Sequence, residues 1–232
     1  NSNGVGNMEK RYIIGIDQST QGTKALLFDG VGHLLRRTDL PHRQIVNEKG
    51  WVSHDLNEIY RNTVQTVKTL VAESGVAPET IAGIGISNQR ETTAIWDKAT
   101  GEPLEEAIVW QCGRASGIAQ EIAEQGHAEE IREATGLQLS AYFPAAKMAW
   151  LLRNGGEERQ KRAADGKLCL GTIDSWLVYK LTGDHAFKTD FSNASRTQLF
   201  NLKTLAWDEK ICEIFGIPAC ALARVCDSDA VY

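Results

Sequence analysis

The sequence predicts an α/β fold in which helices flank a mixed β-sheet, and three observations support this prediction. Two continuous apolar runs typical of buried strands, YIIGID at 12–17 and IAGIGIS at 81–87, stand on either side of an amphipathic helical pattern. Glycine-containing turns divide the opening segment into short pieces. The order of strands, one helix, more strands and then several helices is typical of α/β or α+β proteins rather than of bundles or sandwiches.

The first part of the chain reads as a three-stranded meander, a helix and two more strands. The apolar run Tyr12–Asp17 predicts the first strand, and the polar turn Gln18–Thr23 joins it to a second strand at Lys24–Asp29. A turn at 30–32 leads to a third strand at His33–Arg37. Asp55 is an N-cap candidate for the amphipathic helix that follows it. The two later strands are expected at Ile81–Ser87 and Thr92–Trp96.

The second part of the chain is mainly helical. Periodic apolar positions predict most of these helices, Gly136 is a plausible end signal, and Gly155–Gly156 should stop another helix. Helices are expected at Ala115–Glu124, Glu129–Thr135, Tyr142–Asn154, Asp174–Leu181 and Asp208–Phe215, with a short buried strand at Leu168–Leu170. This element order is compatible with a ribonuclease-H-like core, although periodicity alone does not single it out.

Composition favours a globular protein in a reducing compartment. The 232 residues are 42% hydrophobic and 24% charged, and the net charge of -5 argues against a nucleic-acid-binding surface. No apolar stretch is long enough to predict a membrane-spanning helix. The five cysteines are odd in number and lack C-x-x-C spacing, so we expect reduced thiols, each a small buried hydrophobe, in a cytoplasmic protein.

A polar turn, Asp17–Lys24, follows the first predicted strand. A tight hairpin of small residues exposes backbone N–H groups, and Gly22 allows a ligand to approach the backbone closely. Hydroxyl groups add donors for phosphate oxygens, and Asp17 is placed to hold Mg²⁺ through water. The turn reads as a phosphate-binding site or as an ordinary polar hairpin, and it lacks the G-x-x-x-x-G-K-[ST] pattern of a Walker A loop.

Two other segments carry candidate binding residues. In SNQRETT at 87–93, adjacent Arg90 and Glu91 offer donors and acceptors that match a vicinal diol, or form a solvated turn with a minor ion pair. Trp110, in AIVWQ at 107–111, either packs in the core or covers the carbon face of a sugar or polyol. Lys147 and Trp150 share one face of the helix expected at 142–154, which by itself indicates only an amphipathic helix.

The helix expected at 142–154 also carries a resemblance. The segment resembles the first signature of the FGGY carbohydrate kinase family at each constrained position, namely Tyr142, Pro144, Lys147, Met148, Trp150, Leu151, Arg153 and Asn154. Asp17–Lys24 is similar to the family's phosphate-binding turn. The runs NQRETT at 88–93 and IVWQC at 108–112 are similar to those of its glycerol kinases, and GWV at 50–52, HD at 54–55 and NASRT at 193–197 also look like family counterparts. The resemblance covers residues 11–232.

This resemblance implies a fold, an activity and a set of site residues. Family members have two ribonuclease-H-like domains of the actin-like ATPase kind, with the active site in the cleft between them. Residues 11–232 would form the amino-terminal domain, and residues 1–10 a disordered leader or a cloning remnant. The implied reaction is ATP-dependent phosphorylation of a small polyol, first of all glycerol to glycerol 3-phosphate, with ATP and Mg²⁺ as cofactors. Positions matching the family would hold the polyol (Arg90, Glu91, Trp110 and Tyr142), the nucleotide phosphates (Thr20, Gln21, Gly22 and Lys24) and the metal (Asp17).

Three departures from the family pattern bear on these expectations. The run Ser19–Lys24 looks more like the turn of xylulose-type kinases, and Gly113 stands where glycerol kinases usually carry a basic residue. Family members are much longer than this chain, and their general-base aspartate lies in a Gly-Asp-Gln-type turn that would fall beyond Tyr232. We therefore expect this chain to lack a catalytic base, to be inactive alone and to need its own carboxy-terminal domain as a partner.

Several alternatives stay open. The intact protein could phosphorylate another sugar or polyol, such as xylulose or a tetritol, or it could be a non-kinase actin-like ATPase. A ribonuclease-H-like nuclease with Asp17 and Glu91 as metal ligands is disfavoured, because the acidic composition offers no basic groove. The sequence leaves open whether the protein forms a homo-oligomer.

Overall fold

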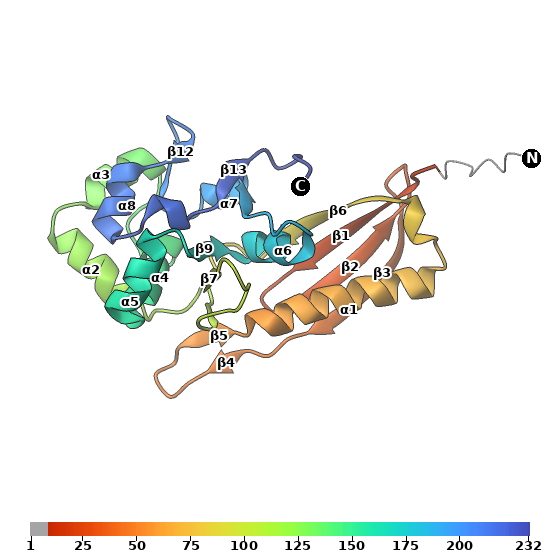
Figure 1. Ribbon diagram of the computed structural model, residues 1–232, viewed down its shortest axis with the longest axis horizontal. Helices are drawn as coiled ribbons and strands as arrows, with labels where there is room; N and C mark the ends of the chain where they lie inside the picture. The colour runs from red at the N-terminus through yellow and green to blue at the C-terminus, as the bar shows by residue number, and fades with distance from the viewer. Residues whose placement is uncertain (1–8) are drawn as a thin grey trace, which may run out of the picture. The chain divides into compact units, whose positions relative to one another are not determined.

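A computed structural model describes residues 9–232, which fold into two compact units (Figure 1). The first unit contains the described residues up to Arg43 together with Glu58–Asn88, and the second contains Gln44–Asn57 and Gln89–Tyr232. Of the leader expected at residues 1–10, residues 1–8 lie outside the described part. The assignment of residues 11–232 to one amino-terminal domain stays a prediction. None of the helices between residues 9 and 232 is long and apolar enough to cross a bilayer.

The first unit is a four-stranded mixed sheet with one long helix. The strand order is β3-β2-β1-β6, in which β1–β2 and β2–β3 are antiparallel and β1–β6 is parallel. The unit's elements are β1 (Tyr12–Gln18), β2 (Gly22–Phe28), β3 (Leu34–Pro41), most of α1 (Leu56–Ser74), the 3₁₀ helix η1 (Pro78–Thr80) and β6 (Ile81–Asn88). The mixed sheet and the long helix confirm the predicted α/β class.

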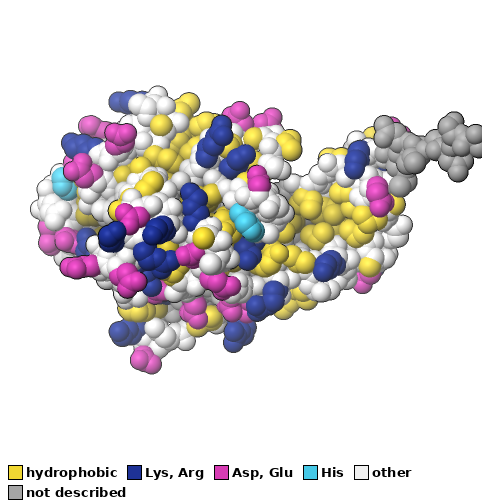
Figure 2. Space-filling model, in the orientation of Figure 1, with side chains coloured by type: hydrophobic (Ala, Val, Ile, Leu, Met, Phe, Trp, Pro, Cys, Tyr) yellow, Lys and Arg dark blue, Asp and Glu magenta, His cyan; other side chains and the backbone are white. Residues whose placement is uncertain are grey.

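Strand alternation places the core of this unit on one face of the sheet. Ile14 and Ile16 of β1 are buried with Leu27 of β2 and Leu70 of α1, because alternate side chains of a strand point to opposite faces. Ile13, next to the buried Ile14 in β1, is 50% exposed. Figure 2 shows apolar side chains gathered over the strands of this unit.

The second unit is built on a five-stranded sheet with the order β4-β5-β8-β7-β9, whose paired strands are all antiparallel. Its strands are β4 (Ile45–Val46), β5 (Val52–His54), β7 (Thr93–Asp97), β8 (Ala107–Ile108) and β9 (Leu168–Thr172). Two small sheets pair β10 (Lys188–Asp190) with β13 (Arg224–Cys226) and β11 (Phe200–Asn201) with β12 (Ala206–Trp207). Its helices are α2 (Ser116–Glu124), α3 (Ala128–Thr135), α4 (Pro144–Asn154), α5 (Gly156–Ala164), α6 (Ile173–Leu181), α7 (Phe191–Ala194), α8 (Glu209–Phe215) and the 3₁₀ helix η2 (Ala219–Ala221).

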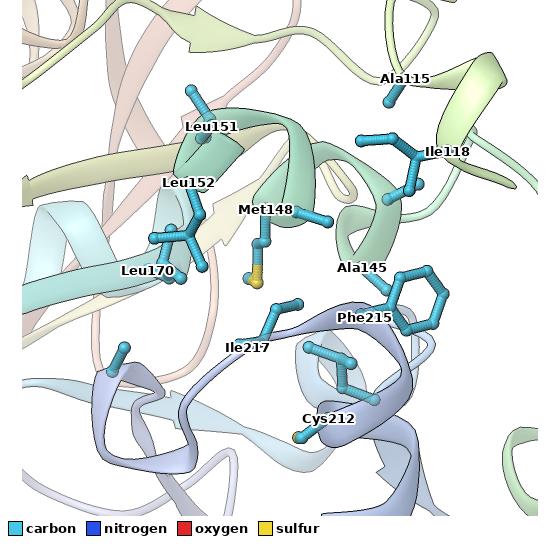
Figure 3. Close-up of a cluster of buried hydrophobic side chains, with 14 of the residues drawn as sticks. Ala115, Ile118, Ala145, Met148, Leu151, Leu152, Leu170, Cys212, Phe215 and Ile217 are labelled. Carbon is cyan, nitrogen blue, oxygen red and sulfur yellow. The ribbon is translucent and has the colours of Figure 1, made fainter. Parts of the chain in front are cut away.

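Helix α4 lies at the centre of the core of the second unit (Figure 3). Met148, Leu151 and Leu152 of α4 are almost fully buried and belong to one cluster with Phe215 and Ile217. The helix begins at Pro144, two residues later than the predicted Tyr142, because proline is favoured at the first helical position. Tyr142 therefore lies in the loop that enters the helix.

The structure differs from the sequence predictions at α5 and at two cysteines. α4 ends at Asn154, just before Gly155–Gly156, as predicted, but an additional helix, α5, begins at Gly156, whose backbone is left-handed with φ at +73°. The run GEERQKRAA has one buried residue, Ala163, so it has too little apolar periodicity to be recognised. All five cysteines are free, but Cys220 is exposed and Cys226 is partly exposed, so the prediction of a buried thiol is wrong for these two.

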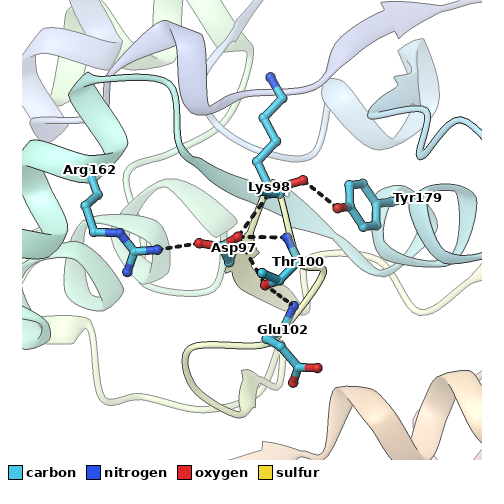
Figure 4. A network of polar contacts seen from close by, with 7 residues as sticks. Asp97, Lys98, Thr100, Glu102, Arg162 and Tyr179 are labelled. Atoms are coloured by element: carbon cyan, nitrogen blue, oxygen red, sulfur yellow. Dashed lines mark hydrogen bonds and ion pairs between the residues drawn. The ribbon is translucent and has the colours of Figure 1, made fainter.

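Residues at the turn after β7 form hydrogen bonds with side chains of α5 and α6 (Figure 4). Asp97 accepts hydrogen bonds from the backbone N–H groups of Ala99 at 3.0 Å and Thr100 at 2.8 Å, and it pairs with Arg162 of α5. The Thr100 backbone bond is the largest of the contacts that hold the pKa of Asp97 below its usual value. The hydroxyl of Tyr179 on α6 donates to the carbonyl oxygen of Lys98 at 2.6 Å.

Candidate functional site

The polar turn of the first unit, Ser19–Gln21, connects β1 to β2. The backbone N–H and the hydroxyl of Ser19 both donate to the carbonyl oxygen of Gly22, at 2.8 and 3.1 Å. A Cβ atom at Gly22 would lie 2.6 Å from the carbonyl oxygen of Leu40, so only glycine fits where β2 pairs with β3. The structure thus gives Gly22 a packing reason that is independent of any ligand.

The remaining candidates on this turn differ in their exposure. Thr20 is partly exposed and Gln21 is exposed. Asp17 and Lys24 are direct partners in the β1–β2 register, so their side chains share the face of the sheet opposite the buried core residues. The hydroxyl of Thr23 is buried and has no hydrogen-bond partner among residues 9–232, which removes it from the donors expected for a phosphate.

Asp17 stands apart from other acidic residues. Within residues 9–232, no group of three or more His, Cys, Asp or Glu side chains could hold a metal ion. Mg²⁺ often keeps several waters and uses only one or two carboxylates, so a single partly exposed carboxylate fits that ion. This carboxylate does not fit an all-protein metal cage.

In the second unit, Glu91 occupies the bend that leads into β7. Its backbone is left-handed, with φ at +66°, and the residue is only 5% exposed. Nε of Arg196 donates to Oε1 of Glu91 at 2.7 Å. The adjacent Arg90 is exposed, and its side chain forms no hydrogen bond or ion pair with the described residues.

Trp110 and Tyr142 form an aromatic pair on the same unit. Their ring centroids are 5.9 Å apart with an interplanar angle of 63°, an edge-to-face arrangement. The backbone N–H of Trp110 donates to the hydroxyl of Thr92 at 3.2 Å, which links this aromatic pair to the residue that follows Glu91. Tyr142 is 39% exposed and Trp110 is partly buried, so the pair presents ring surface to solvent. Two of the four predicted polyol residues are therefore in contact, and one of them is bonded to the chain neighbour of a third, Glu91.

Lys147 binds the backbone of the loop that carries Tyr142. The side chain, on the first turn of α4, is fully buried, and its Nζ donates to the carbonyl oxygens of Ala141 at 2.5 Å and Tyr142 at 2.6 Å. Burial lowers the pKa of Lys147 to about 8, against smaller opposing effects of Cys112 and Glu91. A buried ammonium near the positive end of a helix is costly, which points to a role in fixing the loop that carries Tyr142.

A chain of hydrogen bonds fixes the segment that carries Glu91. His54 joins Gln44 Oε1 through Nε2 at 2.7 Å and Gln89 through Nδ1 at 3.2 Å. Thr92 donates to Oε1 of Gln89 at 2.7 Å. The pattern is satisfied when His54 carries its proton on Nε2, so that Nδ1 accepts from the Gln89 amide. Buried side chains of this kind hold both ends of the Gln89–Thr92 bend.

Cys112 and Arg114 form a second group of hydrogen-bonded side chains in this unit. Arg114 donates to Sγ of Cys112 at 3.2 Å and to the hydroxyl of Ser53 at 2.5 Å, and it lies over the rings of Trp51 and Trp150. Burial raises the pKa of the Cys112 thiol, but the hydrogen bonds and the charge of Arg114 outweigh burial and lower it overall. The basic side chain that follows Gly113, Arg114, thus packs against other residues of this unit.

Asp174 should make the stability of the protein depend on pH. It is buried on α6 and accepts hydrogen bonds from the hydroxyls of Thr172 and Thr189, and burial raises its pKa to about 6. Because the native carboxyl keeps its proton where the unfolded one has lost it, this group makes the protein less stable as pH rises from about 4 to about 6. The melting temperature of the wild type minus that of Asp174→Asn should therefore be about 5 °C lower at pH 6 than at pH 4.

The control for this measurement is Asp184→Asn, since Asp184 is exposed. The melting difference between Asp184→Asn and the wild type should stay constant from pH 4 to 6. A constant difference for Asp174→Asn as well would contradict the raised pKa.

Sequence reasoning missed two supports of the site. Lys147 was recognised as part of an amphipathic helix, although a lysine among apolar positions is a signal of a buried ammonium. Arg196 was noticed only within the run NASRT, because its partner lies 105 residues away in the sequence. No local pattern predicts such a pair.

Comparisons with known proteins identify relatives of the chain. Residues 12–232 match the model of the FGGY family of carbohydrate kinases, N-terminal domain. The chain is 45% identical to glycerol kinase 2 of Thermotoga maritima over 222 residues, which are 96% of this chain and 45% of that protein. It is 47% identical to the glycerol kinase of Symbiobacterium thermophilum over 225 residues, covering 97% of this chain and 45% of that protein. The chain therefore spans less than half the length of these relatives.

Solved structures agree with these sequence relatives. The crystal structure of Plasmodium falciparum glycerol kinase with ADP matches with a TM-score of 0.83 and 37% identity, over 94% of this chain and 43% of that one. A ligand-bound xylulose kinase from Lactobacillus acidophilus matches with a TM-score of 0.82 and 27% identity, over 93% of this chain and 42% of that one. These similarities confirm the ribonuclease-H-like, actin-like ATPase fold that the resemblance implied.

Proposed function

Because the chain belongs to the FGGY family of carbohydrate kinases, we propose that the full-length protein transfers a phosphoryl group from ATP to glycerol, giving glycerol 3-phosphate. Residues 11–232 would be its amino-terminal domain and would need the carboxy-terminal domain for activity. The observation that carries the proposal is that the buried Glu91 precedes Thr92, whose hydroxyl accepts a hydrogen bond from the backbone of Trp110 in the aromatic pair with Tyr142.

The proposed polyol site combines polar and apolar recognition. Glu91 accepts a hydrogen bond from one hydroxyl of the substrate, and the exposed Arg90 donates to a neighbouring hydroxyl. The rings of Trp110 and Tyr142 cover the carbon backbone of the polyol and keep water from it. Glycerol, a three-carbon triol, offers both hydroxyl groups and a carbon backbone, and so do larger polyols.

The proposed nucleotide site is the turn of the first unit. Thr20, Gln21, Gly22 and Lys24 would bind the phosphates of ATP through backbone N–H groups, a hydroxyl and the lysine charge. Asp17 would hold Mg²⁺ through water, and the ion would neutralise charge on the phosphates. The side chains of this turn thus bind and orient the nucleotide.

The proposal assigns the general base to the carboxy-terminal domain, as an aspartate that would accept the proton of the attacking hydroxyl. Transfer to carbon-bound oxygen rather than to water requires the acceptor hydroxyl to be held in line with the phosphoryl group. On this chain, that positioning is the task of Arg90 and Glu91.

The free thiols of all five cysteines are compatible with a cytoplasmic location of the full-length protein. That it forms a homo-oligomer stays a prediction.

The proposal predicts a selective effect of Glu91→Ala in the full-length protein. Losing a hydrogen bond to a charged acceptor costs about 1.5–3 kcal/mol, so the KM for glycerol should rise about 10- to 100-fold. The KM for ATP should stay unchanged. Glu129→Ala, which removes an exposed glutamate of the same unit, is the control and should leave both values unchanged. An unchanged KM for glycerol in Glu91→Ala would show that this residue does not bind the polyol.

A substrate panel separates the proposal from its alternatives. ADP release by the full-length protein would be measured with Mg-ATP and glycerol, tetritols, pentitols or ketopentoses. Preference for a ketopentose such as xylulose, or for a tetritol, would support the alternative suggested by the turn Ser19–Lys24 and by Gly113. ATP hydrolysis that no polyol or sugar stimulates would favour a non-kinase ATPase.

A further inference from the structure

Glu91 is held in a conformation that its own sequence does not favour. A left-handed backbone at a residue other than glycine costs about 1–3 kcal/mol and persists only where the surroundings impose it. The side chain is also almost fully buried, and burying a carboxylate without compensation is costly. Some contact must therefore offset both costs.

The compensating contact is made by Arg196. Its Nε donates to Oε1 of Glu91 at 2.7 Å, and its guanidinium lies 5.1 Å from the ring centroid of Phe143, the residue after Tyr142. The backbone that presents Arg196 is itself fixed. The N–H of Arg196 donates to Asn193, and the N–H of Ala145 on α4 donates to the carbonyl oxygen of Thr197 at 3.0 Å.

The ion pair leaves part of the carboxylate available. The bond to Nε is one-pronged, and Oε2 of Glu91 has no hydrogen-bond partner among residues 9–232. A bidentate pair would have occupied both oxygens. The arrangement thus fixes the plane of the carboxylate through one oxygen and leaves the other to accept from a ligand.

Stability alone is a weak explanation for this pair. Buried ion pairs often contribute little net stability, because desolvation offsets their attraction. The exposed pair of Arg132 and Glu129 shows how a helix surface forms such a contact without burial or backbone strain. What distinguishes Arg196 is that it bridges Glu91 and the loop of Tyr142, two parts of the proposed polyol site.

We propose that Arg196 is a positioning residue, which fixes the carboxylate of Glu91 through Oε1 so that Oε2 accepts a hydroxyl of the polyol; this rests on the proposed function. Arg196 does not need to touch the substrate. Without its guanidinium, the buried carboxylate would rotate or draw in water, and the polyol would lose an oriented acceptor.

The test uses steady-state kinetics of the full-length protein with glycerol. Arg196→Gln should raise the KM for glycerol about 10-fold, with a smaller change in kcat and an unchanged KM for ATP. Arg196→Lys should recover part of the affinity, because lysine keeps the charge but not the rigid planar donor. Arg132→Gln is the matched control and should behave like the wild type.

A double-mutant cycle distinguishes positioning from a general structural role. In a Glu91→Gln background, Arg196→Gln should change the KM for glycerol less than about 2-fold, because its target is already gone. A full 10-fold increase in that background, or an unchanged KM in Arg196→Gln alone, would overturn the proposal. If Arg196→Gln does not fold, the same cycle is run with Arg196→Lys. A wild-type enzyme that does not turn over glycerol would instead refute the proposed function.

Discussion

Replacing Lys147 by methionine should lower the free energy of unfolding by about 3 kcal/mol and raise the KM for glycerol. Methionine matches the length of the buried stem and fills most of its space, so the cavity cost is small. The carbonyl oxygens of Ala141 and Tyr142 both lose the donor that Nζ supplies. Leaving each buried acceptor without a partner costs about 1–3 kcal/mol, and removal of the desolvated ammonium offsets part of this loss.

The pH dependence gives this prediction a second signature. The pKa of Lys147 is about 8, whereas the ordinary pKa of lysine, which an unfolded chain shows, is 10.5. Between these values the unfolded chain binds more protons than the native one, so this group adds stability as pH rises. The stability difference between wild type and Lys147→Met should therefore grow from pH 8 to pH 10.

Lys161→Met is the matched control, because Lys161 is exposed on α5 and forms a surface ion pair with Asp165. Its stability should change by less than about 1 kcal/mol. The measurement is denaturant unfolding of the full-length proteins, followed by kinetics with glycerol. Equal stability of Lys147→Met and wild type at both pH values would refute a structural role of the buried ammonium.

Gly22→Ala should destabilise the first unit by about 3 kcal/mol. The added Cβ would lie 2.6 Å from the carbonyl oxygen of Leu40 and 3.1 Å from Cα of Pro41. Both contacts are with backbone, which cannot swing away as a flexible side chain can, so β2 and β3 must separate locally. Amide hydrogen exchange in β2 and β3 should become faster, and the KM for ATP should rise because the turn that would bind phosphate is displaced.

Gly85→Ala provides the control in the same sheet. A Cβ at Gly85 on β6 has no heavy atom of the described part of the chain within 4 Å, and alanine restricts the unfolded chain more than glycine does. Its stability should stay equal to that of the wild type or rise slightly. Similar exchange rates in Gly22→Ala and wild type would show that β3 yields at no cost, contrary to the prediction.

The elements that the sequence predicted well are those whose burial follows from a local period. β1 and β6 read as apolar runs, and α4 reads as an amphipathic helix that starts at Pro144. The sequence did not indicate α5, because its polar residues leave only Ala163 buried. The short strand β5 was also missed, since its three residues carry no period and form a strand only by pairing with a distant segment, β8.

The fold class, the family resemblance and the candidate residues for polyol and phosphate could all be read from the sequence. Those residues lie in short runs whose chemistry can be read locally. Their supporting contacts could not be read in this way, because Glu91 adopts a left-handed backbone and is bonded to the distant Arg196, and Lys147 binds the backbone of the loop of Tyr142. The physical reason is that burial and hydrogen-bond partners depend on which distant segments pack together, and no local period encodes that.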